Sequence, residues 1–114
     1  MNSPAEREGQ FEVSASTAPG VATFTLRGEL DIATADQLTA ELDALESAAG
    51  SRRVIDLSAV SFMDSTGLRV LIAANRAAEG GEYELIVVTG DSPARRVLEL
   101  TRMDEHMSVV DALA

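Results

Sequence analysis

One acid and two hydroxyls stand together in the sequence, at the point where an apolar run gives way to a helix-like pattern. The stretch SFMDSTGLRV at positions 61–70 places Asp64, Ser65, Thr66 and Gly67 there. Aspartate or serine before a helix usually caps it, because the side-chain oxygen accepts a hydrogen bond from a free backbone N–H group. Asp64 is sufficient for this cap and leaves Ser65 available. The alternative, in which Ser65 is itself only a cap, stays open at this point.

A free hydroxyl at the start of a helix is a candidate for phosphorylation. A phosphate adds about −1.5 to −2 charge units, and the unpaired amides and positive dipole end of a helix N-terminus tolerate that charge. We therefore expect phosphorylation of Ser65 to leave the fold intact, although Asp64, and Asp31 if it is near, oppose the added charge. A like-charge or desolvated contact costs several kcal/mol across an interface, which is sufficient to release a partner.

The composition excludes several other kinds of chemistry. The chain has 114 residues, the size of one domain, and its net charge of −10 makes nucleic acid and anionic membranes poor partners. It has no cysteine and no lysine, so disulfides, thiolate chemistry, Schiff bases and the P-loop are excluded. We expect the single histidine, His106, to be a surface residue. Carboxylates do not cluster at ligand spacing, and we expect no metal and no cofactor.

The hydrophobic patterns also indicate where the protein resides. No apolar run is long enough to cross a bilayer, and no charged-then-apolar leader opens the chain. The absence of cysteine suits a reducing compartment. We therefore expect a cytoplasmic protein, with a flexible N-terminus at residues 1–9 and one domain at residues 10–114.

Alternating and helical patterns predict an α/β domain. Residues 10–16 and 21–28 alternate apolar and polar positions around the turn-forming APG, as an antiparallel hairpin does. Strands that alternate with helices favour a largely parallel sheet, and the hairpin makes this sheet mixed. The further strands are expected at 52–58 and 83–90, with a last short strand and a stub of helix within 107–114. The helices are expected at 35–49, 65–79 and about 93–101.

The predicted helices have recognisable start and stop signals. Leu38, Leu42 and Leu45 form the apolar stripe of the first helix. The signals are a capping-box pattern at Thr34 and Gln37, stops at Gly50 and at Gly80–Gly81, and an N-cap with a first-turn proline at Ser92–Pro93.

The second helix carries apolar residues on a face that we expect to be exposed. At about 100° per residue, the arc that must face the sheet comprises Gly67, Val70, Leu71, Ala73, Ala74, Ala77 and Ala78. The opposite arc comprises Ser65, Arg69, Asn75, Arg76 and Glu79, but it also carries Leu68 and Ile72. We interpret Leu68 and Ile72 as the apolar centre of a docking patch with arginines at its rim. The alternative is that a neighbouring loop covers them, or that they are simply exposed.

Three blocks of the sequence resemble the STAS-domain family, and within it the single-domain anti-sigma factor antagonists. The blocks are GELDIATADQL, VIDLSAVSFMDSTGLRVL and SPARRVLELTRMDEHMSVV, and the likeness spans roughly residues 11–110. The resemblance implies a STAS-like single domain, with a mixed, mostly parallel sheet packed against helices. It also implies a cytoplasmic regulator without catalytic activity. We expect this regulator to be a monomer.

The resemblance further implies a phosphorylation switch. The unphosphorylated form would bind an anti-sigma factor that is also a GHKL-type serine kinase, and so free the sigma factor. The kinase would use ATP to phosphorylate Ser65, which abolishes binding, and a PP2C-type serine phosphatase would reverse the modification. The residues implied in or beside the contact surface are Asp31, Asp64, Thr66, Gly67 and Leu68, and the exposed arc adds Arg69 and Ile72.

The sequence departs from the family pattern at two positions, and two rival functions stay open. Thr66 replaces a common serine, and Arg69 stands where glycine is frequent, which affects partner choice. One rival is an accessory STAS subunit of a lipid-transport ABC ATPase, which needs docking but no phosphorylation switch. The other is a hydrolase, which the absence of a general base or phosphate-binding loop near Ser65 disfavours.

Overall fold

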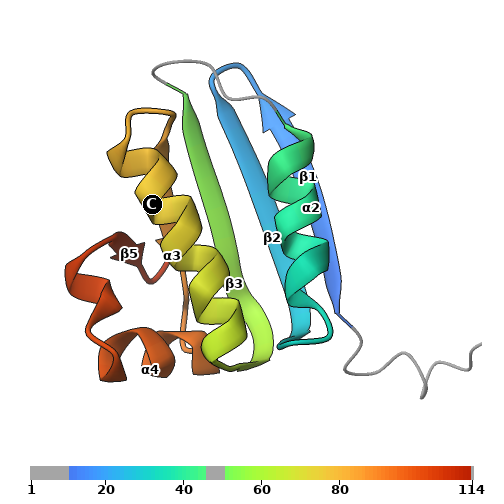
Figure 1. Cartoon of the computed structure of the whole chain (residues 1–114), viewed down its shortest axis with the longest axis vertical. Coiled ribbons are helices and arrows are strands. Elements are labelled where there is room, and N and C mark those ends of the chain that lie inside the picture. The colour runs from blue at the N-terminus through green and yellow to red at the C-terminus, as the bar shows by residue number, and fades with distance from the viewer. Residues whose placement is uncertain (1–10, 46–50, 114) are drawn as a thin grey trace, which may run out of the picture.

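The computed structural model describes residues 11–45 and 51–113, and within them a single mixed sheet forms the centre of the molecule (Figure 1). The five strands stand in the order β1-β2-β3-β4-β5. β1 and β2 pair antiparallel, and the other neighbours pair parallel. The predicted fold class is therefore confirmed. The strands are β1 (Glu12–Ala18), β2 (Val21–Leu30), β3 (Arg52–Met63), β4 (Glu84–Val88) and β5 (Ser108–Val110).

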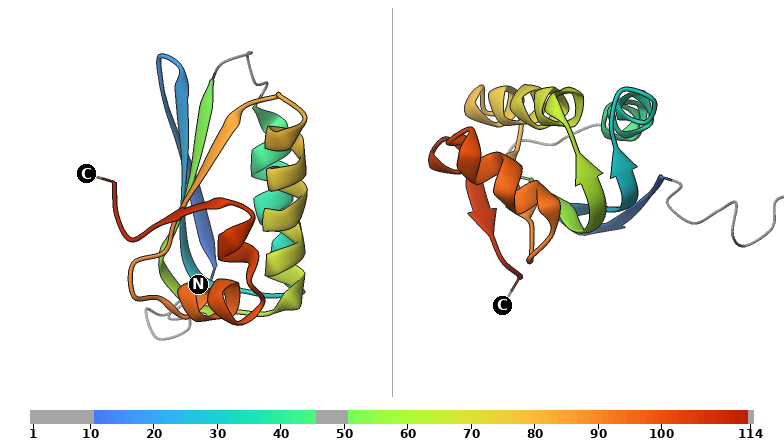
Figure 2. Two further views of the ribbon diagram at one scale, coloured as in Figure 1. Left: turned by 90° about the vertical axis from the view of Figure 1, so that its left-hand side faces the viewer. Right: turned by 90° about the horizontal axis from the view of Figure 1, so that it is seen from below.

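The helices are distributed unevenly around this sheet. α2 (Ala35–Ala44) and α3 (Ser65–Glu79) lie side by side on one face of the sheet, as Figure 1 and the view from below in Figure 2 show. α4 (Pro93–Leu100) packs against β3 at the carboxyl end of the sheet, below α3 in Figure 1. A short 3₁₀ helix, η1 (Met103–Glu105), leads into β5. Because β2, β3 and β4 run parallel and each is followed by a helix, the starts of α2, α3 and α4 lie at the same edge of the sheet.

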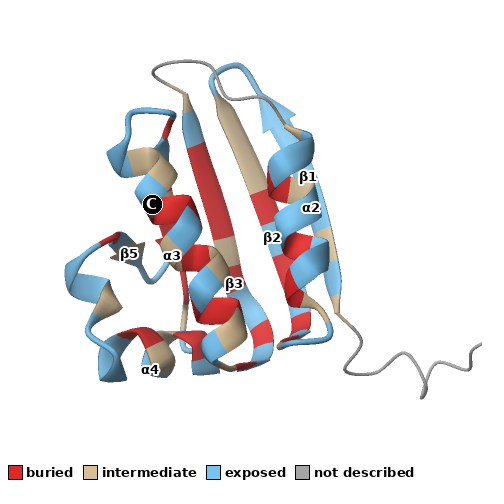
Figure 3. Ribbon diagram, in the orientation of Figure 1, coloured by how far each residue is buried: buried red, intermediate tan, exposed pale blue. Residues whose placement is uncertain are grey.

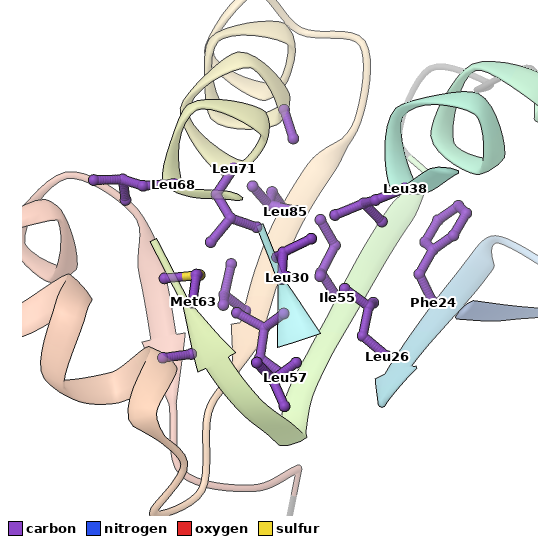
Figure 4. Packing of buried hydrophobic residues seen from close by; sticks show 14 of the residues in the cluster. Phe24, Leu26, Leu30, Leu38, Ile55, Leu57, Met63, Leu68, Leu71 and Leu85 are labelled. Carbon is purple, nitrogen blue, oxygen red and sulfur yellow. The ribbon is translucent and has the colours of Figure 1, made fainter. Parts of the chain in front are cut away.

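The core lies between the sheet and the pair α2 and α3 (Figures 3 and 4). In β2, buried residues alternate with exposed ones from Phe24 onward, so that one face is apolar. The residues with no exposed surface include Phe24, Leu26, Leu30, Leu38, Ile55, Leu57 and Leu71. The predicted stripe of α2 is partly confirmed, because Leu38 and Leu42 are buried whereas Leu45 is half-buried and ends the helix.

β3 extends five residues beyond its predicted end at Ser58, so that prediction was too short. The register with β2 shifts twice, between Thr25 and Arg27 and between Gly28 and Glu29. At each shift β3 contains one residue more than β2, so buried and exposed residues do not alternate regularly in the second half of β3. The prediction depended on the continuous apolar run of residues 52–58, which does not continue there. Gly28 has a φ of +94°, a backbone conformation that strongly favours glycine.

The chain ends and loops account for the remaining differences. α2 ends at Ala44, while Ala49 and the predicted stop at Gly50, like residues 1–9, lie outside the described residues. The predicted bounds of α3 and its closure at Gly80 are confirmed. Residues 111–113 are not helical, so the expected final stub of helix is absent from this part of the chain.

A buried arginine joins the end of α2 to the sheet. Arg53 is 6% exposed, and its guanidinium donates to the carbonyl oxygens of Leu42 at 2.9 Å and Leu45 at 2.6 Å. The same group lies 4.6 Å from the centroid of the Tyr83 ring. Burial raises the pKa of the Tyr83 phenol, although Arg53 acts in the opposite direction. The Arg53 guanidinium thus donates hydrogen bonds to carbonyl oxygens at the end of α2, where the helix itself offers no amide partner, and it also lies over the Tyr83 ring.

Replacing Arg53 tests this role. We expect Arg53→Met to lower the free energy of unfolding by about 1–3 kcal/mol, because it removes hydrogen bonds from a charged donor to buried carbonyls. The neighbouring Arg52 is the matched control, since its side chain forms an exposed pair with Glu84 at 3.2 Å. Arg52→Met should change stability by about 0.5 kcal/mol or less. Urea unfolding of both variants measures the difference, and equal losses would contradict the assignment.

Candidate functional site

The two motif segments of the sequence meet where β2 and β3 end. The strands pair Leu30 with Met63, and the Asp64 amide donates to the Leu30 carbonyl oxygen at 3.3 Å. Asp31 and Ser65 each follow one partner of this hydrogen bond directly in the chain. The structure thus brings Asp31 to the same sheet edge as Asp64 and Ser65. We call this region the carboxyl edge.

Asp64 caps α3 through its side chain. Its Oδ1 accepts hydrogen bonds from the Thr66 amide at 2.9 Å and the Gly67 amide at 3.3 Å. Asp64 itself has extended backbone angles, with φ −112° and ψ −169°, as an N-cap residue usually has. The prediction that Asp64 supplies the cap is confirmed.

Ser65 is left free by this arrangement. It is the first residue of α3 and is exposed. Among the hydrogen bonds of the described residues, none involves the Ser65 hydroxyl, whereas the neighbouring Thr66 is half-buried. The alternative in which Ser65 is the cap is therefore wrong. An accessible hydroxyl on a rigid helix start is geometrically suited to modification by another protein.

Gly67 allows the start of α3 to approach the sheet closely. A Cβ atom at this position would lie 2.7 Å from Leu30 Cγ and 3.0 Å from Met63 Cγ. Both distances are shorter than ordinary van der Waals contact, and Leu30 is fully buried. Gly67 is thus a packing residue that holds the first turn of α3 against the ends of β2 and β3.

The loop between β2 and α2 is shaped by Asp31 and Thr34. Asp31 Oδ1 accepts from the Ala33 amide at 3.0 Å. Thr34 Oγ1 accepts from the Asp31 amide at 2.9 Å and donates to the Glu29 carbonyl oxygen at 2.7 Å. The predicted capping box is wrong in this respect, because the Thr34 side chain turns back to the loop and makes no cap bond to α2.

The buried face of α3 differs from the predicted one. Leu68 is only 8% exposed and belongs to the core cluster (Figure 4), so its predicted place on the exposed face is wrong. Ile72 is half-buried and packs against the same cluster. Asn75 is also buried, and its Nδ2 donates to the His106 carbonyl oxygen at 3.0 Å. The C-terminal segment therefore contacts this flank of α3 through Asn75. Helical periodicity does not predict a contact between residues so far apart in the sequence.

One narrow ridge of α3 stays exposed. Ser65, Arg69, Ala73 and Arg76 follow each other at steps of four, four and three residues, and all are exposed. Ala73 was predicted to face the sheet and does not. Arg69, predicted for the contact surface, is confirmed as exposed. His106 is exposed as predicted.

Two large apolar residues at the carboxyl edge were not predicted as part of the site. Ile32, in the loop after β2, is 79% exposed, and Phe62, near the end of β3, is 47% exposed. Phe62 alternates with the buried Met63, so it points away from α2 and α3. The exposure of Ile32 could have been predicted, because an apolar residue stands inside the polar turn at Asp31. The exposure of Phe62 could not, because the predicted strand ended at Ser58.

Nearly the whole chain, and not the carboxyl edge alone, matches a known family. A family model described as the STAS domain matches residues 12–114. The chain belongs to the STAS domain family. Within the part of this STAS protein that the structure describes, no helix is both long and apolar enough to cross a membrane.

Individual relatives agree with this assignment. The STAS protein is 33% identical over 94 residues to the anti-sigma-F factor antagonist RsfB of Mycobacterium tuberculosis, a match that covers 82% of this chain and 76% of the relative. The crystal structure of an anti-sigma factor antagonist from Mycobacterium paratuberculosis is 26% identical, with a TM-score of 0.76 over 99% of this chain and 92% of that chain. The Bacillus cell fate determinant SpoIIAA in its phosphorylated form shares the fold, with 21% identity, a TM-score of 0.56 and coverage of 89% and 91%.

The close approach at Gly67 generates one prediction. Gly67→Ala should lower the free energy of unfolding by up to about 2 kcal/mol, because the overpacking cost of about 1–3 kcal/mol outweighs a helix-propensity gain of about 1 kcal/mol. Gly80→Ala is the matched control at the other end of α3, where φ is −76° and the nearest atom to an added Cβ is 3.4 Å away. Thermal unfolding compares the two variants. A Gly67→Ala variant as stable as Gly80→Ala would refute the packing role.

The separation of cap and acceptor generates another prediction. Asp64→Ala should cost about 1 kcal/mol of stability, because two amides of α3 lose their acceptor. Asp64→Asn should retain most of the cap, and Ser65→Ala should leave stability within about 0.5 kcal/mol of the native value. Denaturant unfolding measures all three variants. If Ser65→Ala proved the most destabilising, the assignment of the cap to Asp64 would be wrong.

Proposed function

We propose that this STAS protein is an anti-sigma factor antagonist whose binding is switched by phosphorylation of Ser65. The observation that carries the proposal is the exposed Ser65 hydroxyl at the start of α3, beside a cap that Asp64 supplies alone. The similarity to the anti-sigma-F factor antagonist RsfB supports the class of function.

The proposed cycle has two states. Unphosphorylated, the protein binds an anti-sigma factor, and the sigma factor is released. The anti-sigma factor is also a GHKL-type serine kinase, which transfers the γ-phosphoryl group of ATP to Ser65 Oγ and leaves ADP. The modified protein dissociates, and a PP2C-type phosphatase hydrolyses the phosphoserine to serine and inorganic phosphate.

The proposed docking surface is the carboxyl edge together with the first turns of the α3 ridge. Its apolar contacts are Ile32 and Phe62, both of them exposed, in place of the buried Leu68. Apolar side chains surrounded by charged groups suit a protein–protein contact. In this proposal, Asp31, Asp64 and Arg69 supply the charged groups of the surface. Thr66 and Ile72 lie at its rim, and Gly67 and Leu68 support it from within.

The charge of the phosphate is the proposed reason for release. It would add about −1.5 to −2 charge units beside Asp64 and Asp31, in a region that the partner desolvates. Such a contact costs several kcal/mol, and each 1.4 kcal/mol weakens binding about tenfold. The phosphorylated SpoIIAA structure shares this fold, which supports the view that the fold itself accommodates a phosphate.

The remaining features of the proposal follow from the same class of function. We propose that the chain catalyses no reaction of its own, requires no cofactor and acts as a monomer in the cytoplasm. Its partner surface is then available in one copy per molecule, and the kinase and the phosphatase supply all of the chemistry.

The test begins with co-purification of the protein from its native host and identification of its partners by mass spectrometry. The purified partner kinase is then incubated with ATP and either native protein or Ser65→Ala. Intact-mass analysis should show one added phosphoryl group on the native protein and none on Ser65→Ala, which should still bind the kinase. Peptide mapping should place the group on Ser65.

A charge control separates a specific switch from general repulsion. Ser65→Asp should bind poorly, whereas Ser16→Asp, which adds the same charge at an exposed position of β1, should bind as the native protein does. Phosphate found only on Ser58 or Thr66 would refute the assignment. Capture of an ABC ATPase in place of a kinase would favour the accessory-subunit function.

A further inference from the structure

The exposed ridge of α3 places a cation one helical turn after the proposed phosphorylation site. Ser65 and Arg69 are separated by four residues, and both are exposed. Among the ion pairs of the described residues, none involves Arg69. By contrast, Asp64, the nearest carboxylate in sequence, is engaged by the amides of α3. Arg69 is therefore available to a group that appears at Ser65.

We propose that Arg69 binds the phosphate of phosphorylated Ser65 within the same helix. The inference rests on the proposed phosphorylation of Ser65. Residues at positions i and i+4 of a helix are neighbours, with Cβ atoms about 5–6 Å apart, and an anion that precedes a cation in the chain has the favourable orientation. The planar guanidinium group donates two parallel hydrogen bonds to a phosphate, which lysine cannot do.

The pairing gives phosphorylation a second effect on the docking surface. The modification adds an anion at Ser65, and it also engages the Arg69 guanidinium, which the unmodified protein presents to solvent. A partner that contacts this ridge would then lose its contact with the Arg69 cation and, at the same time, face the negative charge at Ser65. Arg69 thus acts as a positioning residue for the phosphate, and it fixes the phosphate along α3.

The other charged groups near Ser65 do not supply this function. Asp31 and Asp64 repel a phosphate, and Asp31 is committed to its own loop through the Ala33 amide. Arg76 is exposed on the same ridge but follows Ser65 by eleven residues, which corresponds to about 16 Å along the helix axis. Arg76 is therefore a matched control for Arg69, with the same chemistry on the same helix beyond the reach of the phosphate.

The experiment uses full-length protein with phosphoserine incorporated at position 65 during translation, so no kinase is required. In ¹H–¹⁵N NMR spectra, the Arg69 Nε–Hε signal should shift and exchange more slowly with water in the phosphorylated protein than in the unmodified one. The Arg76 signal should be the same in both. Signals are assigned by their loss in Arg69→Gln and Arg76→Gln. An unchanged Arg69 signal would overturn the proposal.

A second measurement follows removal of the phosphate by a broad-specificity protein phosphatase. Arg69→Gln should lose its phosphate about two- to fivefold faster than the native sequence, the range expected for an exposed ion pair. Arg69→Lys should be intermediate, and Arg76→Gln should match the native rate. Equal rates for native protein and Arg69→Gln would refute the pairing. Failure of the partner kinase to modify Ser65 would refute the proposed function and leave these results unaffected.

Discussion

The close packing of α3 against the ends of β2 and β3 determines where every functional group of this protein lies. Gly67 allows this close approach, because an added Cβ would overlap Leu30. The hydrogen bond from the Asp64 amide to the Leu30 carbonyl oxygen joins the same two segments. Together these contacts fix the height and direction at which α3 leaves the sheet. Ser65, one residue after Asp64, is placed at the surface as a consequence.

Asp64 caps α3 and Ser65 presents the free hydroxyl, and this separation of the two roles makes a surface switch physically possible. Asp64 holds two amides of α3, so the helix start does not depend on the side chain of Ser65. A modification of Ser65 then changes charge at the surface without removing a contact that stabilises the fold. In the proposed function, the charge of the phosphate repels the partner and attracts Arg69. The core between the sheet and the helices keeps its packing.

Much of this arrangement follows from the sequence, because it is local. The alternation of β2, the bounds of α3 and the Asp64 cap depend on residues within a few positions of each other, and all were predicted. The placement of Leu68 was wrong because Leu68 belongs to the core cluster, and the C-terminal segment reaches the same flank of α3 at the hydrogen bond between Asn75 and the His106 carbonyl. Helical periodicity identifies an apolar face, but it does not identify which distant segment covers the flank.

Irregular backbone accounts for the other differences. The register shifts near Gly28 extend β3 and turn Phe62 outward, and a strict period of two does not describe them. The Thr34 hydroxyl oxygen accepts from the Asp31 amide in place of a free amide of α2, and the hydroxyl donates to the Glu29 carbonyl oxygen. Both partners precede α2 in the chain, so a capping pattern that considers only the residues after Thr34 was insufficient.

The most direct test of the central claim compares protein carrying phosphoserine at position 65 with unmodified protein, in the same titration against the anti-sigma factor that co-purifies with it. The free energy of unfolding is measured on the same two samples. The account predicts that affinity falls by about 100-fold or more while stability changes by less than about 1 kcal/mol. Equal affinities, or a phosphorylated form that is substantially unfolded, would contradict it.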